Sequence, residues 1–205
     1  MTIILLSTWF GSKGESAFKD ELEPLGPSPK VAIIHNALRF KLWRILNNWL
    51  IGVKFRKLGC KPVYIDLTVP TEMITRLEHC SIVYLGSGDT RRFKKILQEK
   101  TSGGIRIVDH LTRVGGILIG ASAGAIVCGA DIRTGDMLGD SKAVKVRSHR
   151  ALNLLPDQAC LFPHSKSRHS KIIQWEKANG FPFRIWLLRD GESMFILEGQ
   201  PYRHD

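Results

Sequence analysis

The stretch Ile117-Leu118-Ile119-Gly120-Ala121-Ser122-Ala123-Gly124 leads from an apolar run into a serine that is flanked by small residues. The run predicts a buried strand, and Ala125-Ile126-Val127-Cys128, which follows it, can begin a helix. A G-x-S-x-G sequence between a strand and a helix is typical of a nucleophile elbow, a turn so tight that only small residues fit beside the serine. The plainer alternative is a glycine-rich turn with an incidental serine. In this context we favour Ser122 as a nucleophile, at a helix N-terminus whose N–H groups can stabilise an oxyanion.

The rest of the chain alternates between short apolar runs and amphipathic stretches, which predicts a parallel sheet with helices on both faces. The predicted strands are short, rich in β-branched residues and end in polar residues or glycine: Ile3–Ser7, Val31–Asn36, Pro62–Leu67, Ser81–Leu85 and Gly116–Gly120. The predicted helices are Phe40–Leu58, Thr71–His79, Arg91–Lys100 and Ile105–Val114.

Near the C-terminus the pattern changes. Ile185–Leu188 and Ser193–Leu197 flank Asp190-Gly191, which indicates a hairpin-like turn. We therefore expect antiparallel strands at one edge of the sheet. With no internal repeat and no linker, the 205 residues are expected to form one α/β domain with a mostly parallel central sheet.

Composition limits the class of protein. No apolar run reaches the roughly 18–20 residues of a transmembrane helix, and the first residues predict a strand better than a signal peptide. The four cysteines, at spacings that suit neither zinc nor a disulfide framework, are expected to be reduced and mostly buried in a cytoplasmic protein. They are Cys60, Cys80, Cys128 and Cys160.

The charge of +11 arises from 30 lysines and arginines against 19 acidic residues. The basic residues are scattered over predicted helices and are not interleaved with aromatics as a base-stacking surface requires. We therefore expect a solvated basic surface that attracts acidic substrates, and no nucleic-acid partner. With no apolar run long enough to span a bilayer, we expect no membrane partner either.

A serine nucleophile needs a base, and His164 is the best placed of the seven histidines. It follows the apolar run Ala159–Phe162 and Pro163, a strand end expected at the same edge of the sheet as Ser122. The loop Gly86-Ser87-Gly88-Asp89-Thr90 also ends a predicted strand. It could supply a backbone N–H to an oxyanion hole, cradle a phosphate, or be a plain turn with Asp89 or Thr90 as a helix N-cap.

Four segments together resemble the dipeptidase E and cyanophycinase family of serine peptidases, from the first strand to about Gly199. Gly86–Thr90 resembles that family's GGGNT loop, and Gly120–Ala125 resembles its GxSAGA elbow. Ile132–Met137 resembles the segment with its acidic residue. Ala151–Pro156 with Phe162-Pro163-His164 resembles the segment with its histidine.

The resemblance implies a three-layer α/β sandwich of the flavodoxin-like, class I glutamine amidotransferase type, with serine in place of cysteine. It implies a serine-type hydrolase with a triad of Ser122, His164 and Asp136, an acyl-enzyme intermediate, and an oxyanion hole of the Gly88 and Ala123 N–H groups. Such enzymes cleave dipeptides with an N-terminal aspartate and need no metal or organic cofactor. A small peptide is the implied partner, and a homodimer is left open.

The sequence departs from the family at the loop, where Ser87 replaces glycine and Asp89 replaces asparagine. An extra carboxylate there would repel a substrate carboxylate, whereas Arg168 could bind one through a bidentate pair. Asp140 and Glu192 are alternatives to Asp136 as the acid, and Glu192 lies in a late loop where cyanophycin-cleaving relatives place theirs.

Two other functions fit the same scaffold or the same order of residues. The altered loop favours a catalytically idle or regulatory binding protein. An α/β-hydrolase esterase shares the order Ser, Asp, His, but there the acid normally follows further strands. A class I amidotransferase is disfavoured because the elbow holds no cysteine.

Overall fold

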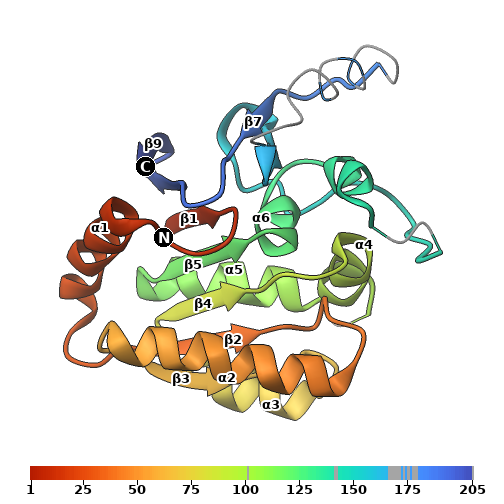
Figure 1. Cartoon of the computed structure of the whole chain (residues 1–205). Helices are drawn as coiled ribbons and strands as arrows, with labels where there is room; N and C mark the ends of the chain where they lie inside the picture. Colours follow the sequence, from red (N-terminus) through yellow and green to blue (C-terminus); the bar gives the residue numbers. More distant parts are fainter. Residues whose placement is uncertain are drawn as a thin grey trace.

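The computed structural model describes residues 1–100, 102–140, 143–165, 172, 174, 176 and 180–204. Its main sheet has seven strands in the order β3-β2-β4-β5-β1-β8-β9 (Figure 1). Five of them are mutually parallel: β3 (Lys61–Tyr64), β2 (Lys30–Ile34), β4 (Ile82–Leu85), β5 (Ile117–Ala121) and β1 (Thr2–Leu6). The last two, β8 (Ser193–Leu197) and β9 (Gln200–His204), are antiparallel. The mostly parallel sheet with antiparallel strands at its C-terminal edge is confirmed.

Helices cover both faces of the sheet, so that it has two apolar cores. On one face, α1 (Ser12–Leu22) and α2 (Lys41–Lys57) bury Phe18 and Phe55 against β1, β2 and β4. The other face packs against α3 (Pro70–Leu77), α4 (Thr90–Lys94), α5 (Gly103–Val114) and α6 (Ala123–Cys128). Every residue of β5 is buried, as expected for a central parallel strand with both faces covered. The three layers confirm the predicted sandwich.

The predicted hairpin across Asp190-Gly191 is wrong, because the strands on either side of this turn do not pair with each other. β7 (Ile185–Leu187) pairs in parallel with β6 (Cys160–Phe162) in a separate two-stranded sheet, and β8 joins the main sheet beside β1. The hairpin lies one turn later, between β8 and β9, where Glu198 and Gly199 both have positive φ. Positive φ at both central residues suits the twist of a two-residue hairpin. Asp190-Gly191 instead carries the chain from the small sheet to the main one.

Most helices follow the expected ranges, with two exceptions. The range predicted for Arg91–Lys100 divides into α4 and a π-helical segment at Lys95–Lys100, and α1 was not predicted. Short segments of 3₁₀-helix lie at Glu23–Leu25, Arg133–Leu138 and Pro156–Gln158.

All four cysteines are buried and free, as predicted. Burial raises the pKa of Cys128 to about 12 and that of Cys60 to about 11, so both remain thiols at neutral pH. Within the described part of the chain, no helix is long and apolar enough to cross a bilayer.

Candidate active site

The turn between β5 and α6 holds Ser122 in a conformation that few side chains adopt. Its φ and ψ are 51° and −110°, while its N–H donates to the carbonyl of Leu6 on β1. The turn is closed by two glycines. A Cβ on Gly120 would lie 2.6 Å from the carbonyl oxygen of Gly124, and a Cβ on Gly124 would collide with the carbonyl of Leu85. The segment is therefore a nucleophile elbow in geometry as well as in sequence.

His164 lies beside the elbow serine. It comes two residues after β6 ends and adopts a left-handed φ of 58°, which is uncommon for a residue other than glycine. Its Nε2 lies 3.1 Å from Ser122 Oγ. This is the separation that a general base needs from the hydroxyl that it deprotonates.

The carboxylate next to His164 belongs to Asp190, which the sequence analysis did not select. Asp190 Oδ1 lies 2.6 Å from His164 Nδ1. The pairing of β6 with β7 makes this contact: Leu188 N–H donates to Phe162 O and Ser165 N–H to Leu188 O, so the residues after both strands stay together. With Nδ1–H donating to Asp190, Nε2 is free to accept the Ser122 proton.

A fourth residue, Ser7, connects the same groups from the end of β1. Its fully buried hydroxyl donates to Asp190 Oδ1 at 2.6 Å and accepts the His164 N–H at 2.8 Å. The hydroxyl oxygen also lies 3.2 Å from His164 Nδ1. Because Ser7 directly follows β1 of the main sheet, it holds both the backbone of His164 and the carboxylate of Asp190 in place. The only sequence signal for Ser7 is its position, since it is the polar residue that ends the first predicted strand.

Asp136 is not the partner of His164 in this structure. Its two carboxylate oxygens each accept a hydrogen bond of 2.8 Å from Arg91, through Nε and a terminal nitrogen. This bidentate pair ties the 3₁₀ segment Arg133–Leu138 to α4. Asp136 therefore has a structural role here, and the assignment of the acid to it is corrected to Asp190.

The two alternative acids are also engaged elsewhere. Asp140 Oδ2 accepts the Thr90 N–H at 3.1 Å, and burial is the main cause that raises its pKa to about 6. Glu192 Oε2 accepts the Arg189 N–H at 2.6 Å, which closes the turn that carries Asp190. Glu192, the alternative suggested by cyanophycin-cleaving relatives, thus lies two residues from Asp190, the carboxylate that contacts His164.

The loop after β4 lies against the elbow, because β4 pairs with β5 and Leu85 contacts Gly124. Gly88 has a φ of 141°, and a Cβ there would lie 2.6 Å from the carbonyl carbon of Ala37. Asp89 is the N-cap of α4: its Oδ1 accepts the Arg92 N–H at 2.7 Å. Ala123 is the first residue of α6. Arg168 lies outside the described residues.

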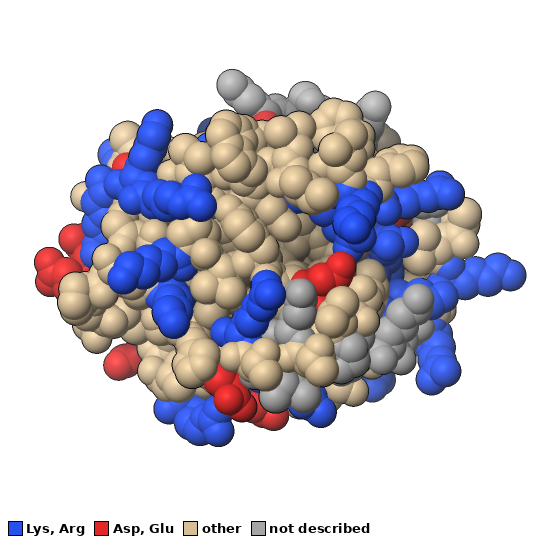
Figure 2. All heavy atoms as spheres, turned by 90° about the horizontal axis from the view of Figure 1, so that it is seen from below, with Lys and Arg blue, Asp and Glu red and all other residues tan. Residues whose placement is uncertain are grey.

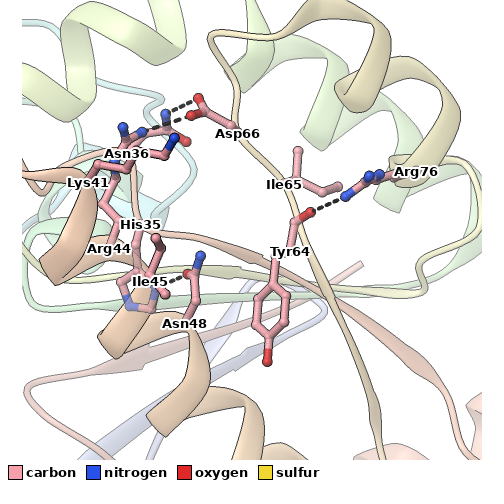
Figure 3. Close-up of a pocket in the computed structure, with 10 residues that line it drawn as sticks. All are labelled: His35, Asn36, Lys41, Arg44, Ile45, Asn48, Tyr64, Ile65, Asp66 and Arg76. Atoms are coloured by element: carbon pink, nitrogen blue, oxygen red, sulfur yellow. Dashed lines mark hydrogen bonds and ion pairs between the residues drawn. The ribbon is translucent and has the colours of Figure 1, made fainter.

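Next to this loop, a cavity of about 230 Å³ opens between α2 and β3 (Figure 3). His35 forms its inner side, so close to Gly86 that a Cβ on Gly86 would strike the imidazole. Burial lowers the pKa of His35 despite its hydrogen bond to Asn48, so it stays neutral near pH 7. Arg44 and Asn36 both donate to Asp66, at 2.8 Å and 2.7 Å, across the mouth of the cavity.

Two solved structures resemble this chain over most of its length. A candidate peptidase E protein from Listeria monocytogenes EGD-e matches with a TM-score of 0.75 and 21% identity, covering 99% of this chain and 97% of that one. A peptidase from an acI-B1 Actinobacterium matches with a TM-score of 0.71 and 16% identity, covering 95% and 82%. At these identities the likeness concerns the fold. No match was found among curated proteins.

The sequence profile of Peptidase family S51 matches residues 51–201, which is most of the chain and includes Ser122, His164 and Asp190. This agrees with the resemblance to the dipeptidase E group and with the elbow geometry. The chain is therefore a serine peptidase that belongs to peptidase family S51.

Proposed function

We propose that this serine peptidase hydrolyses small peptides, and dipeptides with an N-terminal aspartate in particular, through an acyl-enzyme formed on Ser122. The observation that carries the proposal is the continuous chain of contacts from Ser122 Oγ to His164 Nε2 and from His164 Nδ1 to Asp190. An orienting carboxylate, a base and a nucleophile in this order are the parts that acyl transfer requires.

In this mechanism Ser122 Oγ attacks the scissile carbonyl carbon while its proton passes to His164 Nε2. The carbonyl oxygen becomes an oxyanion, which the N–H groups of Gly88 and Ala123 would stabilise. Collapse of this intermediate breaks the C–N bond, and His164 gives its proton to the departing amine. Water then attacks the acyl-Ser122 ester with His164 as base again, which releases the acid and restores the serine.

Within this scheme, Asp190 and Ser7 act through His164. Asp190 would hold the Nδ1–H tautomer and stabilise the imidazolium that forms. Ser7 would keep the imidazole and the carboxylate in register through its two hydrogen bonds. The positive φ of both Ser122 and His164 is the strained backbone geometry that tends to occur at functional sites.

Preference for an acidic N-terminal residue rests on the family resemblance and on charge. The net charge of +11 attracts anionic substrates over a distance of about one Debye length. Asp89, which was expected to oppose such a substrate, directs one carboxylate oxygen to the N-terminus of α4. This hydrogen bond partly offsets the repulsion that a free carboxylate would exert.

The test is hydrolysis of a panel of Asp-X, Glu-X and neutral dipeptides by the wild type and by Ser122→Ala, with Ser16→Ala, an exposed serine of α1, as the matched control. We expect Asp-X cleavage by the wild type and by Ser16→Ala, and none by Ser122→Ala. A fluorophosphonate probe should label Ser122 in the same pattern. A wild type that takes the label but cleaves only neutral dipeptides would overturn the specificity. One that takes no label would favour the binding-protein alternative.

A further inference from the structure

Helix α2 is apolar on the side that faces away from the protein. Its inward side packs through Gly52 and Phe55, both fully or nearly fully buried. Its outward side and first turns expose seven large apolar residues: Phe40, Leu42, Trp43, Ile45, Leu46, Trp49 and Leu50. Leu42 is 78% exposed, and the two tryptophans are 58% and 57% exposed. A surface helix normally has the opposite polarity, so this face, the α2 patch, requires a covering partner.

The charges that α2 and its entrance carry are all positive, although Asp66 lies beside Arg44 at the cavity. Between Glu23 and Asp66 the sequence contains no acidic residue, whereas α2 and its entrance contain six cations: Arg39, Lys41, Arg44, Lys54, Arg56 and Lys57. All except Arg44 are exposed. Figure 2, which looks from below the view of Figure 1, shows a broad tan area with many blue and a few red side chains around it. A partner that covers the patch must therefore accept apolar side chains and carry negative charge.

A second copy of the chain fits this requirement poorly. In a two-fold dimer the same patch meets itself, so the cations of one α2 would face those of the other without a single α2 carboxylate to pair with them. An anionic bilayer surface satisfies both requirements. Aliphatic and tryptophan side chains enter the interfacial region, while lysines and arginines bind lipid phosphates.

We propose that α2 docks this protein on the surface of membranes that contain anionic lipids, as an interfacial helix that does not span the bilayer. This departs from our expectation of no membrane partner. That expectation rested only on the absence of a bilayer-spanning run, which an interfacial helix does not need, and Phe40, Trp43 and Trp49 are exposed among the cations. The proposal does not depend on the peptidase activity.

The cavity shown in Figure 3 adds a feature at the N-terminal end of the α2 patch. Lys41, Arg44 and Ile45 of α2 line it, and Arg76 of α3 lies across from them. Arg44 Nε is buried and has no hydrogen-bond partner among the described residues. The buried Nε is closed to a lipid, whereas the exposed Lys41 would pair with a lipid phosphate close to the apolar side chains that enter the membrane.

The test is co-sedimentation of the full chain with vesicles of phosphatidylcholine alone and of phosphatidylcholine mixed with phosphatidylglycerol. We expect binding to the mixed vesicles only, weakened by salt. Trp43→Ser/Trp49→Ser should lower the affinity at least about tenfold, because each change removes an exposed interfacial anchor. Arg56→Glu/Lys57→Glu should lower it more than about tenfold, since each cation lost near the surface costs about fivefold and the added carboxylates are repelled.

The matched control is Ile105→Ser, which removes an exposed apolar side chain of α5 that is 62% accessible and lies outside the patch. It should bind mixed vesicles as the wild type does. Absence of wild-type binding at low salt would overturn the proposal. So would a dimer in solution that the Trp43→Ser/Trp49→Ser change dissociates, because the patch would then be covered by a second copy. Circular dichroism and thermal unfolding check that each variant is folded.

Discussion

Two carboxylates near the elbow, Asp136 and Asp190, differ in how the chain brings them there. Asp136 follows Ser122 by 14 residues on the same segment, yet it is bound by Arg91. Asp190 is separated from His164 by 26 residues, yet Asp190 Oδ1 lies 2.6 Å from His164 Nδ1, because β6 pairs with β7. The difference shows that strand pairing, and not closeness along the chain, decides which carboxylate lies beside His164.

The largest effect on catalysis is expected when Asp190 and Asp136 are removed in turn. Asp190→Ala should lower kcat about 10³–10⁴-fold, since His164 then loses the partner that sets its tautomer. Asp136→Ala should change kcat only a few-fold, because both of its oxygens serve Arg91. Steady-state hydrolysis of the best dipeptide gives both values. Equal losses of kcat, or a larger loss for Asp136→Ala, would contradict Asp190 as the acid and favour Asp136.

A smaller effect is expected from Ser7, which supports Asp190 from the main sheet. Ser7→Ala removes one hydrogen bond to the carboxylate and one acceptor for the His164 N–H, and we expect kcat to fall about tenfold. The acidic limb of the pH–kcat profile should also move, because the environment of the imidazole changes.

Ser193→Ala is the matched control for Ser7. Ser193 is a second fully buried serine, paired across the sheet with Leu6, and its hydroxyl does not contact His164 or Asp190. This variant should lose stability without a shift of the pH profile. If both variants show the same kinetics, Ser7 is only a packing residue.

The sequence predicted the elbow and the strands around it well, but it did not predict that Asp190 would lie beside His164. Ser122 follows from a local pattern, because the G-x-S-x-G turn and its apolar run lie within ten residues. Each of the five parallel strands likewise follows from its own short apolar run. The prediction of His164 rests on its place after an apolar run and on the resemblance of Phe162-Pro163-His164 to the family segment. The position of Asp190 depends on the three-residue parallel pairing of β6 with β7. No periodic pattern in the sequence predicts this pairing. The neighbours of Asp190 predicted a hairpin instead, and the charge of Asp136 gave no indication that Arg91 would bind it.

The α2 helix illustrates a second limit of sequence reasoning. Its apolar spacing predicted the helix within one residue at each end, but it did not show that the apolar face points away from the core. Gly52 and Phe55 alone among the α2 residues are buried, so the side of the helix that carries them faces the core. A period of 3.6 residues identifies an apolar face and does not say what covers it.

Asp136 is expected to stabilise the fold through its pair with Arg91. The pair with Arg91 is mostly buried, with side chains 18% and 12% exposed. Asp136→Ala leaves the guanidinium without its bidentate partner, and should lower the free energy of unfolding by about 1–3 kcal/mol. Urea denaturation of Asp136→Ala, Arg91→Ala and the double variant measures the coupling. Additive losses would mean that the pair contributes nothing, and Asp136 would need another role.

The smallest effect concerns Asp140, the third carboxylate of this region. Burial raises its pKa in the folded protein to about 6, above the ordinary value of 3.8, so the folded state holds the proton to a higher pH than the unfolded state does. This carboxyl therefore disfavours folding progressively as the pH rises from about 4 to about 6, and by a constant amount above that.

Asp140→Asn should remove this penalty, since an amide oxygen can still accept the Thr90 N–H without carrying a charge. Relative to the wild type, the variant should gain about 1 kcal/mol in free energy of unfolding above pH 6 and nothing below pH 4, once solvent screening is allowed for. The matched control is Asp109→Asn, the same change at an exposed carboxylate of α5. Urea unfolding at pH 4 and pH 7.5 decides the matter. A gain that is equal at both pH values would trace the effect to packing, and the carboxyl of Asp140 would then have an ordinary pKa.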